Sequence, residues 1–173
     1  MTDPDQADAA ASRPTLPTGR LQGRQVFADT LRLAFEVAAD QGWNRITLSD
    51  ADFADWPLGE RAVVDALNRW ARRGRTLKML ARHYDQLRLL HPRFVQWRVT
   101  WSHLVEAQAC ASASADELPS VLWSPGWTLQ RLDTVRCTMV VSRDAERRVA
   151  LQEQLHQWWL KGSSAFPAST LGL

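Results

Sequence analysis

Apolar residues recur along much of the chain at spacings of three and four, the period of one face of a helix. This pattern predicts a first helix over residues 24–40. It predicts a second helix that begins near Pro57 and is stopped by Gly74, since proline suits a first helical turn and glycine a helix end. Further apolar stripes predict a short helix over residues 84–90 and a last helix that starts after Asp144.

Other segments alternate apolar and polar residues, the period of a strand with one buried face. The alternation is strongest over residues 94–106, where Val95, Trp97, Val99 and Trp101 take every second position. We therefore predict that this stretch is core strand. Shorter segments of the same kind, or rich in β-branched residues, predict strands over residues 45–49, 76–81, 103–109, 120–123, 127–132 and 137–141.

The order of these elements predicts the fold class. Strands and helices alternate in the first half of the chain, which implies parallel strands joined by right-handed crossovers. The second half adds antiparallel strands. We expect an α/β domain with a mixed sheet flanked by helices over residues 24–162, after a flexible leader at residues 1–23. Residues 163–173 are expected to be a C-terminal tail that docks on the domain.

The composition of the chain argues against some classes of function but does not identify one. The formal charge of +2 is too balanced to indicate binding to nucleic acid or to a membrane by bulk electrostatics, and no apolar run approaches the ~18 residues of a membrane span. The acidic N-terminus lacks the features of a secretory signal, and the two cysteines, Cys110 and Cys137, suit buried positions in a reducing compartment. We therefore expect a cytoplasmic protein. The sequence implies no cofactor, because it holds no phosphate loop, dinucleotide fingerprint or zinc-spaced cysteines.

One arrangement of segments is similar to a known family. A helix end reading Trp-Ala-Arg-Arg-Gly-Arg at residues 70–75 leads into a strand at 77–80, and a Pro-Arg-Phe-Val segment then leads to His103. This arrangement resembles one half of the phospholipase D-like phosphodiesterase superfamily, and uncharacterised proteobacterial offshoots of that fold. The likeness spans roughly residues 24–162.

The resemblance implies a site that has lost its chemistry. The family's motif, H-x-K-x4-D, supplies a nucleophilic histidine, a phosphate-binding lysine and an orienting aspartate. His103 stands at the histidine position, but Val105 and Cys110 stand at the lysine and aspartate positions. Because valine cannot bind a phosphate oxygen, the resemblance favours a degenerate, non-catalytic site. Glu106 is the candidate acid–base partner of His103, although strand alternation would place the two on opposite faces.

An acidic loop is the candidate metal site. Asp50, Asp52 and Asp55 follow a predicted parallel strand, at the sheet edge where α/β folds tend to bind ligands. Carboxylates there could hold Mg²⁺ or Mn²⁺. The alternative is that they cap the helix that follows.

Basic and aromatic residues mark a third candidate, over residues 69–98. Arginine with tryptophan can bind single-stranded nucleic acid by phosphate contacts and stacking, whereas a helix end attracts cations by its dipole alone. The candidate ligand-binding residues are Arg75, Lys78, Arg98 and Trp101. Trp97 and Trp101, and the pair Trp158–Trp159, are either core residues or an apolar contact surface, as in a homodimer.

These observations lead to one main hypothesis and two alternatives. The main one is a non-catalytic binding or interaction domain on a degenerate phospholipase D-like fold. The first alternative is a phosphodiesterase or nuclease that uses His103 in a homodimer. The second is a nucleic-acid-binding module built on the basic and tryptophan-rich segment from Arg69 to Arg98.

Overall fold

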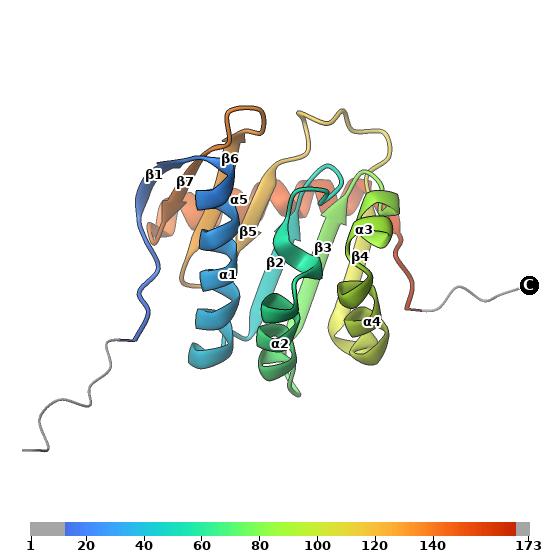
Figure 1. The fold of residues 1–173 in the computed structure, drawn as a ribbon. Coiled ribbons are helices and arrows are strands. Elements are labelled where there is room, and N and C mark those ends of the chain that lie inside the picture. Colours follow the sequence, from blue (N-terminus) through green and yellow to red (C-terminus); the bar gives the residue numbers. More distant parts are fainter. Residues whose placement is uncertain (1–12, 169–173) are drawn as a thin grey trace, which may run out of the picture.

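A computed structural model describes residues 13–168. In this part of the chain the strands form one eight-stranded sheet in the order β1-β7-β6-β5-β2-β3-β4-β8 (Figure 1). β2 (Arg45–Ser49), β3 (Thr76–Ala81) and β4 (Val105–Ala109) are parallel neighbours. Every other pairing is antiparallel and involves β1 (Gly19–Gln22), β5 (Ser120–Trp123), β6 (Thr128–Asp133), β7 (Thr138–Ser142) and β8 (Ser163–Ser164). The predicted mixed-sheet α/β class is confirmed.

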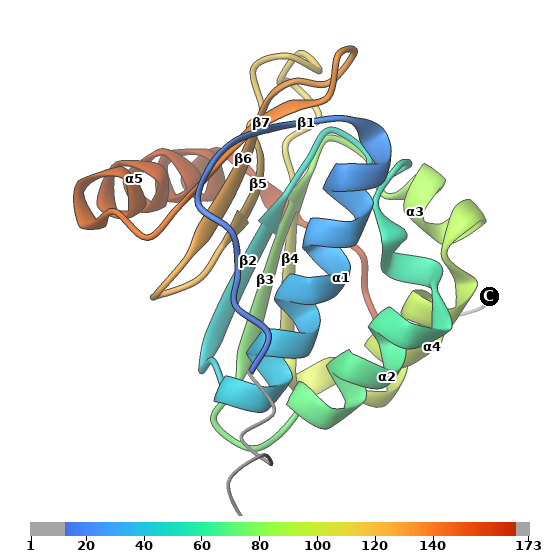
Figure 2. The ribbon, with the colours of Figure 1, turned by 60° about the vertical axis from the view of Figure 1, so that its left-hand side comes forward.

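Helices cover the two faces of this sheet unequally (Figure 2). One face carries the 3-10 turn η1 (Pro57–Gly59) and four helices: α1 (Arg24–Gln41), α2 (Arg61–Trp70), α3 (Asp85–Leu90) and α4 (Pro92–Thr100). In the described part of the chain the other face carries α5 (Ala145–Lys161), which crosses only part of it. None of the helices within residues 13–168 is long and apolar enough to span a membrane.

Local sequence explains where the long helices begin and end. α1 ends because Gly42 adopts a left-handed conformation, with φ of +67°, that residues with a side chain rarely take. α5 begins because the Asp144 carboxylate accepts a hydrogen bond from the Arg147 backbone N–H at 2.9 Å, as the sequence predicts for an N-cap.

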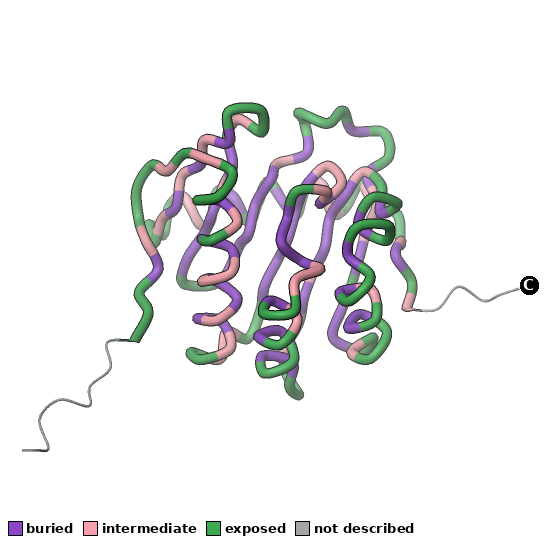
Figure 3. The backbone as a smooth tube through the Cα atoms, viewed as in Figure 1, coloured by how far each residue is buried: buried purple, intermediate pink, exposed green. Residues whose placement is uncertain are grey.

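Two apolar layers hold the helices to the sheet. The larger lies between the sheet and the helices α1 to α4 and includes the fully buried Trp56, Trp70 and Trp127. The smaller lies under α5, where Leu151 and Leu155 pack near Val121 and Trp123 of β5. Figure 3 shows the central strands buried along most of their length, with exposed turns and outer helix faces.

The stretch predicted to be core strand is a helix over most of its length. Residues Pro92–Thr100 form α4, and a 3-10 turn, η2 (Ser102–Leu104), leads into β4. The strand prediction for residues 94–101 was wrong. Phe94, Trp97 and Arg98 are buried at spacings of three and one, which is one side of a helix, while Val99 is exposed.

The end of the predicted leader is part of the fold, which corrects its boundary at residue 23. β1 pairs with β7 at the sheet edge, Leu16 is buried in the main core, and the Trp127 indole N–H donates to the Pro17 carbonyl at 2.9 Å. Backbone pairing orders this polar segment without many large apolar side chains. Residues 1–12 of the predicted leader lie outside the described residues.

The described part of the C-terminal tail docks on the opposite edge. β8 pairs with β4, and Phe166 beyond it is buried. Its ring stacks on Tyr84 at a centroid distance of 5.0 Å, with the Phe94 ring at 6.4 Å. Residues 169–173 lie outside the described residues.

Candidate ligand-binding groove

His103 and Glu106 lie in different elements and have different neighbours. His103 is exposed in the turn η2, with its ring 6.0 Å from that of Trp101. Glu106 lies on β4, and its carboxylate is 3.9 Å from the ammonium group of Lys78. The structure therefore pairs Glu106 with a lysine on the neighbouring strand.

The residues at the other two motif positions belong to the packing of the domain. Val105 is buried in the main core. The Cys110 thiol is buried and donates to the Trp158 carbonyl, and burial raises the pKa of this thiol. Neither position offers a polar group to a ligand.

The acidic loop binds an arginine whose role its sequence position does not predict. The buried guanidinium of Arg131, on β6, donates to Asp50 at 3.0 Å and to Asp55 at 2.5 Å and 3.1 Å. It also lies 4.3 Å from the ring centroid of Phe27. Burial alone would lower the pKa of Arg131, but the hydrogen bond to Asp55 and the charges of both carboxylates raise it above its ordinary value.

The remaining bonds of this loop are turn-forming. Asp50 also accepts the Phe53 backbone N–H at 2.9 Å, and Asp52 accepts that of Ala54 at 2.9 Å. Among residues 13–168, no group of three or more His, Cys, Asp and Glu side chains is placed to hold a metal ion.

An acidic hollow of about 790 Å³ adjoins the loop, lined in part by Asp116, Glu117 and Asp133. Glu117 accepts the Ser114 backbone N–H at 2.7 Å, and Asp133 accepts those of Val135 and Arg136. Hydrogen bonds from Ser114 lower the pKa of both Asp116 and Glu117. These carboxylates shape their own turns, and their charge disfavours an anionic ligand here.

The four basic and aromatic candidates do not share one surface. Arg98 is buried and donates to the carbonyls of Phe166 and Ser102, and burial lowers its pKa. The Trp101 indole N–H donates to the Asn68 side chain at 3.1 Å. Arg75 lies against Gly42, with a guanidinium nitrogen 2.9 Å from where a side chain at that glycine would begin. Lys78 faces the other side of the sheet, toward α5.

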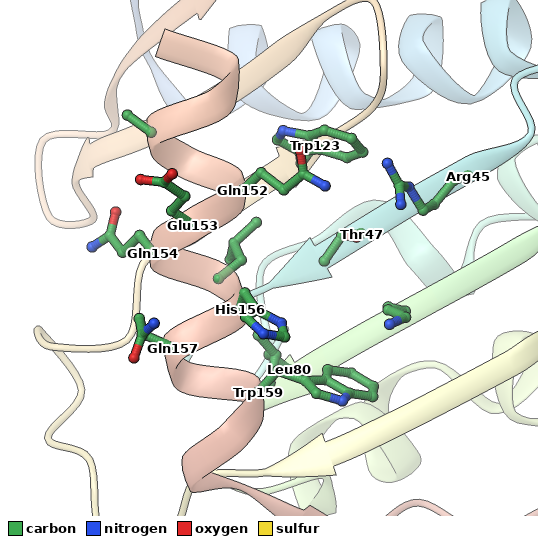
Figure 4. Close-up of a pocket in the computed structure, with 13 residues that line it drawn as sticks. Arg45, Thr47, Leu80, Trp123, Gln152, Glu153, Gln154, His156, Gln157 and Trp159 are labelled. Carbon is green, nitrogen blue, oxygen red and sulfur yellow. The ribbon is translucent and has the colours of Figure 1, made fainter. Parts of the chain in front are cut away.

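Lys78 is one of the residues that line a groove between α5 and the neighbouring part of the sheet. Figure 4 shows this groove. Its volume is about 710 Å³, within the usual range for small-molecule sites. The sheet side is formed by Arg45 and Thr47 of β2 and by Lys78 and Leu80 of β3. The α5 side is formed chiefly by Gln152, Leu155, His156 and Trp159.

Two cations are held in this groove by tryptophan rings. The Arg45 guanidinium lies 4.9 Å from the ring centroid of Trp123, and the Lys78 ammonium lies 4.7 Å from that of Trp159. Such contacts orient a cation without neutralising it. Glu153 is the one carboxylate among the residues that line the groove. The groove therefore presents two cations to a ligand, whereas the acidic hollow is lined mainly by carboxylates.

The sequence contained part of the signal for this groove. Arg45 and Thr47 are the polar half of the alternation in β2, and Gln152, His156 and Trp159 recur at spacings of four and three along α5. The pattern shows that each set shares a face. It does not show that the two faces meet, because that depends on which side of the sheet α5 crosses.

The fold defines a class, a mixed-sheet α/β domain, and comparison with solved structures finds proteins of similar fold. The chain is similar to TrmBL2, an archaeal chromatin protein whose structure is described as showing a novel mode of DNA binding. The TM-score is 0.65 at 16% identity, over 90% of this chain and 57% of that one. The likeness shows the fold, and the chain spans little more than half the length of that neighbour. No family model and no curated protein matches the chain.

The resemblance to the phospholipase D-like superfamily stays a prediction. Two of the segments on which the resemblance rests differ in secondary structure from what was expected. The Pro-Arg-Phe-Val segment is helical, and His103 lies in a turn before the strand.

Proposed function

We propose that this chain is a non-catalytic binding domain and that it binds a small anionic ligand in the groove beside α5. The observation that carries the proposal is the pair of cations, Arg45 and Lys78, that face one cavity. Each is held by a tryptophan ring, and the cavity has a single carboxylate among its lining residues.

The surroundings of the motif positions support a binding role over a catalytic one. His103 is exposed in a turn, Glu106 faces Lys78, and Val105 and Cys110 are buried. A phosphodiesterase built on His103 needs a phosphate-binding group and an acid–base partner close to it. In the structure, Val105 and Cys110 are packing residues, and Glu106 contacts Lys78 instead of His103.

The expected affinity of Lys78 for an anion follows from how exposed Lys78 and its neighbour Glu106 are to solvent. Lys78 is 36% exposed and its contact with Glu106, which is 58% exposed, is long at 3.9 Å. Such a pair contributes about 0–1 kcal/mol in water, so an anion that reaches the ammonium displaces Glu106 at low cost. A hydrogen bond between charged groups is worth about 1.5–3 kcal/mol, which corresponds to roughly a tenfold to hundredfold change in affinity.

The test is a titration of the chain with inorganic phosphate at low ionic strength, followed by tryptophan fluorescence, since Trp159 lines the groove. Lys78→Gln should weaken binding by about tenfold, because it removes one charge-assisted hydrogen bond. Glu106→Gln should tighten binding, because it removes the carboxylate that competes for Lys78. Opposite effects on binding cannot both arise from damage to the fold.

Lys161→Gln is the matched control. Lys161 is a lysine of α5 that also lies over a tryptophan, Trp158, at 4.8 Å, but it does not line the groove. Its loss removes the same charge and should leave phosphate binding unchanged. The proposal would be overturned if the Lys78→Gln variant, the Lys161→Gln variant and the original protein all bound inorganic phosphate with equal affinity.

Nucleic acid is the second candidate ligand, and the structural neighbour favours it because TrmBL2 is described as DNA-binding. Arg72 and Arg73 are exposed in the turn before β3, at the end of the sheet where β2 begins with Arg45. Binding of a labelled oligonucleotide should then fall steeply with salt. The logarithm of the binding constant should fall linearly with the logarithm of the salt concentration. The double variant Arg72→Gln/Arg73→Gln should reduce the magnitude of this slope by about one for each phosphate contact that it loses. Salt-insensitive or undetectable binding at low salt would exclude this ligand.

A further inference from the structure

We propose that the ligand of the groove carries two phosphate groups, one bound by Arg45 and the other by Lys78. This inference rests on the proposed function and adds the chemical class of the ligand. It starts from the positions of the two cations on the sheet.

The strand register separates the cations. β2 and β3 are parallel, with Thr47 opposite Lys78 and Arg45 opposite Thr76. Arg45 and Thr47 are two residues apart and so share a face with Lys78. From a rise of roughly 3.3 Å per residue and a strand spacing of about 4.8 Å, the Cα atoms of Arg45 and Lys78 lie about 8 Å apart.

Each of the two cations contacts a different tryptophan ring. Arg45 is held over Trp123, which belongs to β5 on one side of β2. Lys78 is held over Trp159, near the C-terminal end of α5. Because the rings belong to different elements, each cation is supported separately, and the groove offers an anionic ligand two binding positions instead of one.

The residues between Arg45 and Lys78 suit a ligand whose two phosphate groups are joined by a polar segment. The Thr47 side chain lies beside Lys78 in the register, and Gln152 and His156 face the groove from α5 (Figure 4). A cavity of about 710 Å³ is far larger than one phosphate ion needs. Two phosphate groups joined directly, or through a short hydroxylated chain, match this distribution of charge and hydrogen-bonding groups.

The experiment compares three probes by the same fluorescence titration: inorganic phosphate, pyrophosphate and fructose 1,6-bisphosphate. The last two distinguish adjacent from separated phosphate groups. At least one of them should bind ten or more times more tightly than inorganic phosphate. Arg45→Gln and Lys78→Gln should each remove that advantage, so that all three probes bind the variants with similar affinity.

Arg136→Gln and Lys161→Gln are the matched controls, since neither residue lines the groove, and both should keep the advantage. If inorganic phosphate binds in a Lys78-dependent way and neither doubly phosphorylated probe binds more tightly, the inference fails while the proposed function stands. If an advantage survives in both groove variants, bulk charge causes it and the inference also fails. If no probe binds, both proposals fail.

Discussion

Arg131 shows how one side chain can connect distant parts of this fold. It lies on β6, yet its guanidinium binds carboxylates of the loop after β2 and donates to the Ser120 hydroxyl of β5 at 3.2 Å. Its side chain is 2% exposed, and that of Asp50 is 4% exposed. Burying such charges costs several kcal/mol for each ion unless they are paired, so Arg131 and Asp50 depend on each other.

Arg131→Met should destabilise the protein by about 3 kcal/mol at pH 7, because the Asp50 carboxylate would be left buried and without its cation. Urea unfolding followed by circular dichroism measures this change. The double variant Asp50→Asn/Arg131→Met should be more stable than the sum of the two single losses predicts, since residues in contact are not additive. Additive losses would mean that the two groups do not depend on each other.

The sequence could identify the acidic loop but not the partner that it binds. Asp50 and Asp55 stand out by their position after a strand. Arg131 follows Asp50 by 81 positions, in a strand with no unusual pattern, and only the tertiary fold brings the two together. The same holds for the groove, where Arg45 meets Trp123 and Lys78 meets Trp159 across different elements.

At the scale of elements, helices were predicted correctly where the apolar residues followed the helical period and no other. The stripes of α1 and α5 come with a glycine stop and an aspartate cap, and both helices lie where the sequence predicts them. Residues 94–101 carry two patterns at once. Trp97 and Trp101 are four apart, a spacing that places side chains on one face in a helix and in a strand alike. Pro92 was the better guide, since it stands in the first turn of α4.

A substitution at Val99 tests this assignment in solution. Val99 is 43% exposed on α4, so Val99→Ala should stabilise the protein by about 0.3–0.5 kcal/mol, because alanine has the higher helix propensity. Val140→Ala on β7 is the matched control and should destabilise, since strands favour β-branched residues. Thermal or urea unfolding measures both. A loss of stability at Val99 equal to that at Val140 would contradict the helix.

At the scale of the whole molecule, two regions of different charge lie beside α5: the groove with its two cations, and the acidic hollow. α5 separates them, and Gln154 on this helix lines both the basic groove and the acidic hollow. The net charge of +2 conceals this division. The order of elements could predict a mixed sheet with helices around it. The side on which α5 packs follows from the apolar surface that β5 and its neighbours leave exposed, and that is a property of the assembled sheet.

The homodimer stays a prediction at this scale, and light scattering at several protein concentrations tests it directly. A monomer at all of them would remove the alternative in which a second copy completes a site around His103.

The stability of the whole fold should depend on pH through an ion pair between α1 and the start of α2. Arg32 donates two hydrogen bonds to the Glu60 carboxylate, at 2.6 Å and 2.7 Å. These bonds and the charge of Arg32 lower the pKa of Glu60 against the opposing effect of burial. A folded-state pKa below the unfolded value means that the pair stabilises the protein above about pH 4.3, and that this contribution is lost as pH falls through the folded pKa.

Glu60→Gln should therefore lower the free energy of unfolding by about 0.5 kcal/mol at pH 7, a modest loss because the Arg32 and Glu60 side chains are 32% and 42% exposed. The difference from the original protein should shrink as pH falls from about 4.3, the unfolded-state pKa, through the lower folded-state pKa, because Glu60 is protonated first in the unfolded state and then in the folded state. Asp65→Asn, at an exposed carboxylate of α2, is the control for a simple change in net charge. Urea midpoints measured from pH 7 to pH 3 give the comparison. A difference that stays constant over this range would show that Glu60 acts through packing and not through its charge.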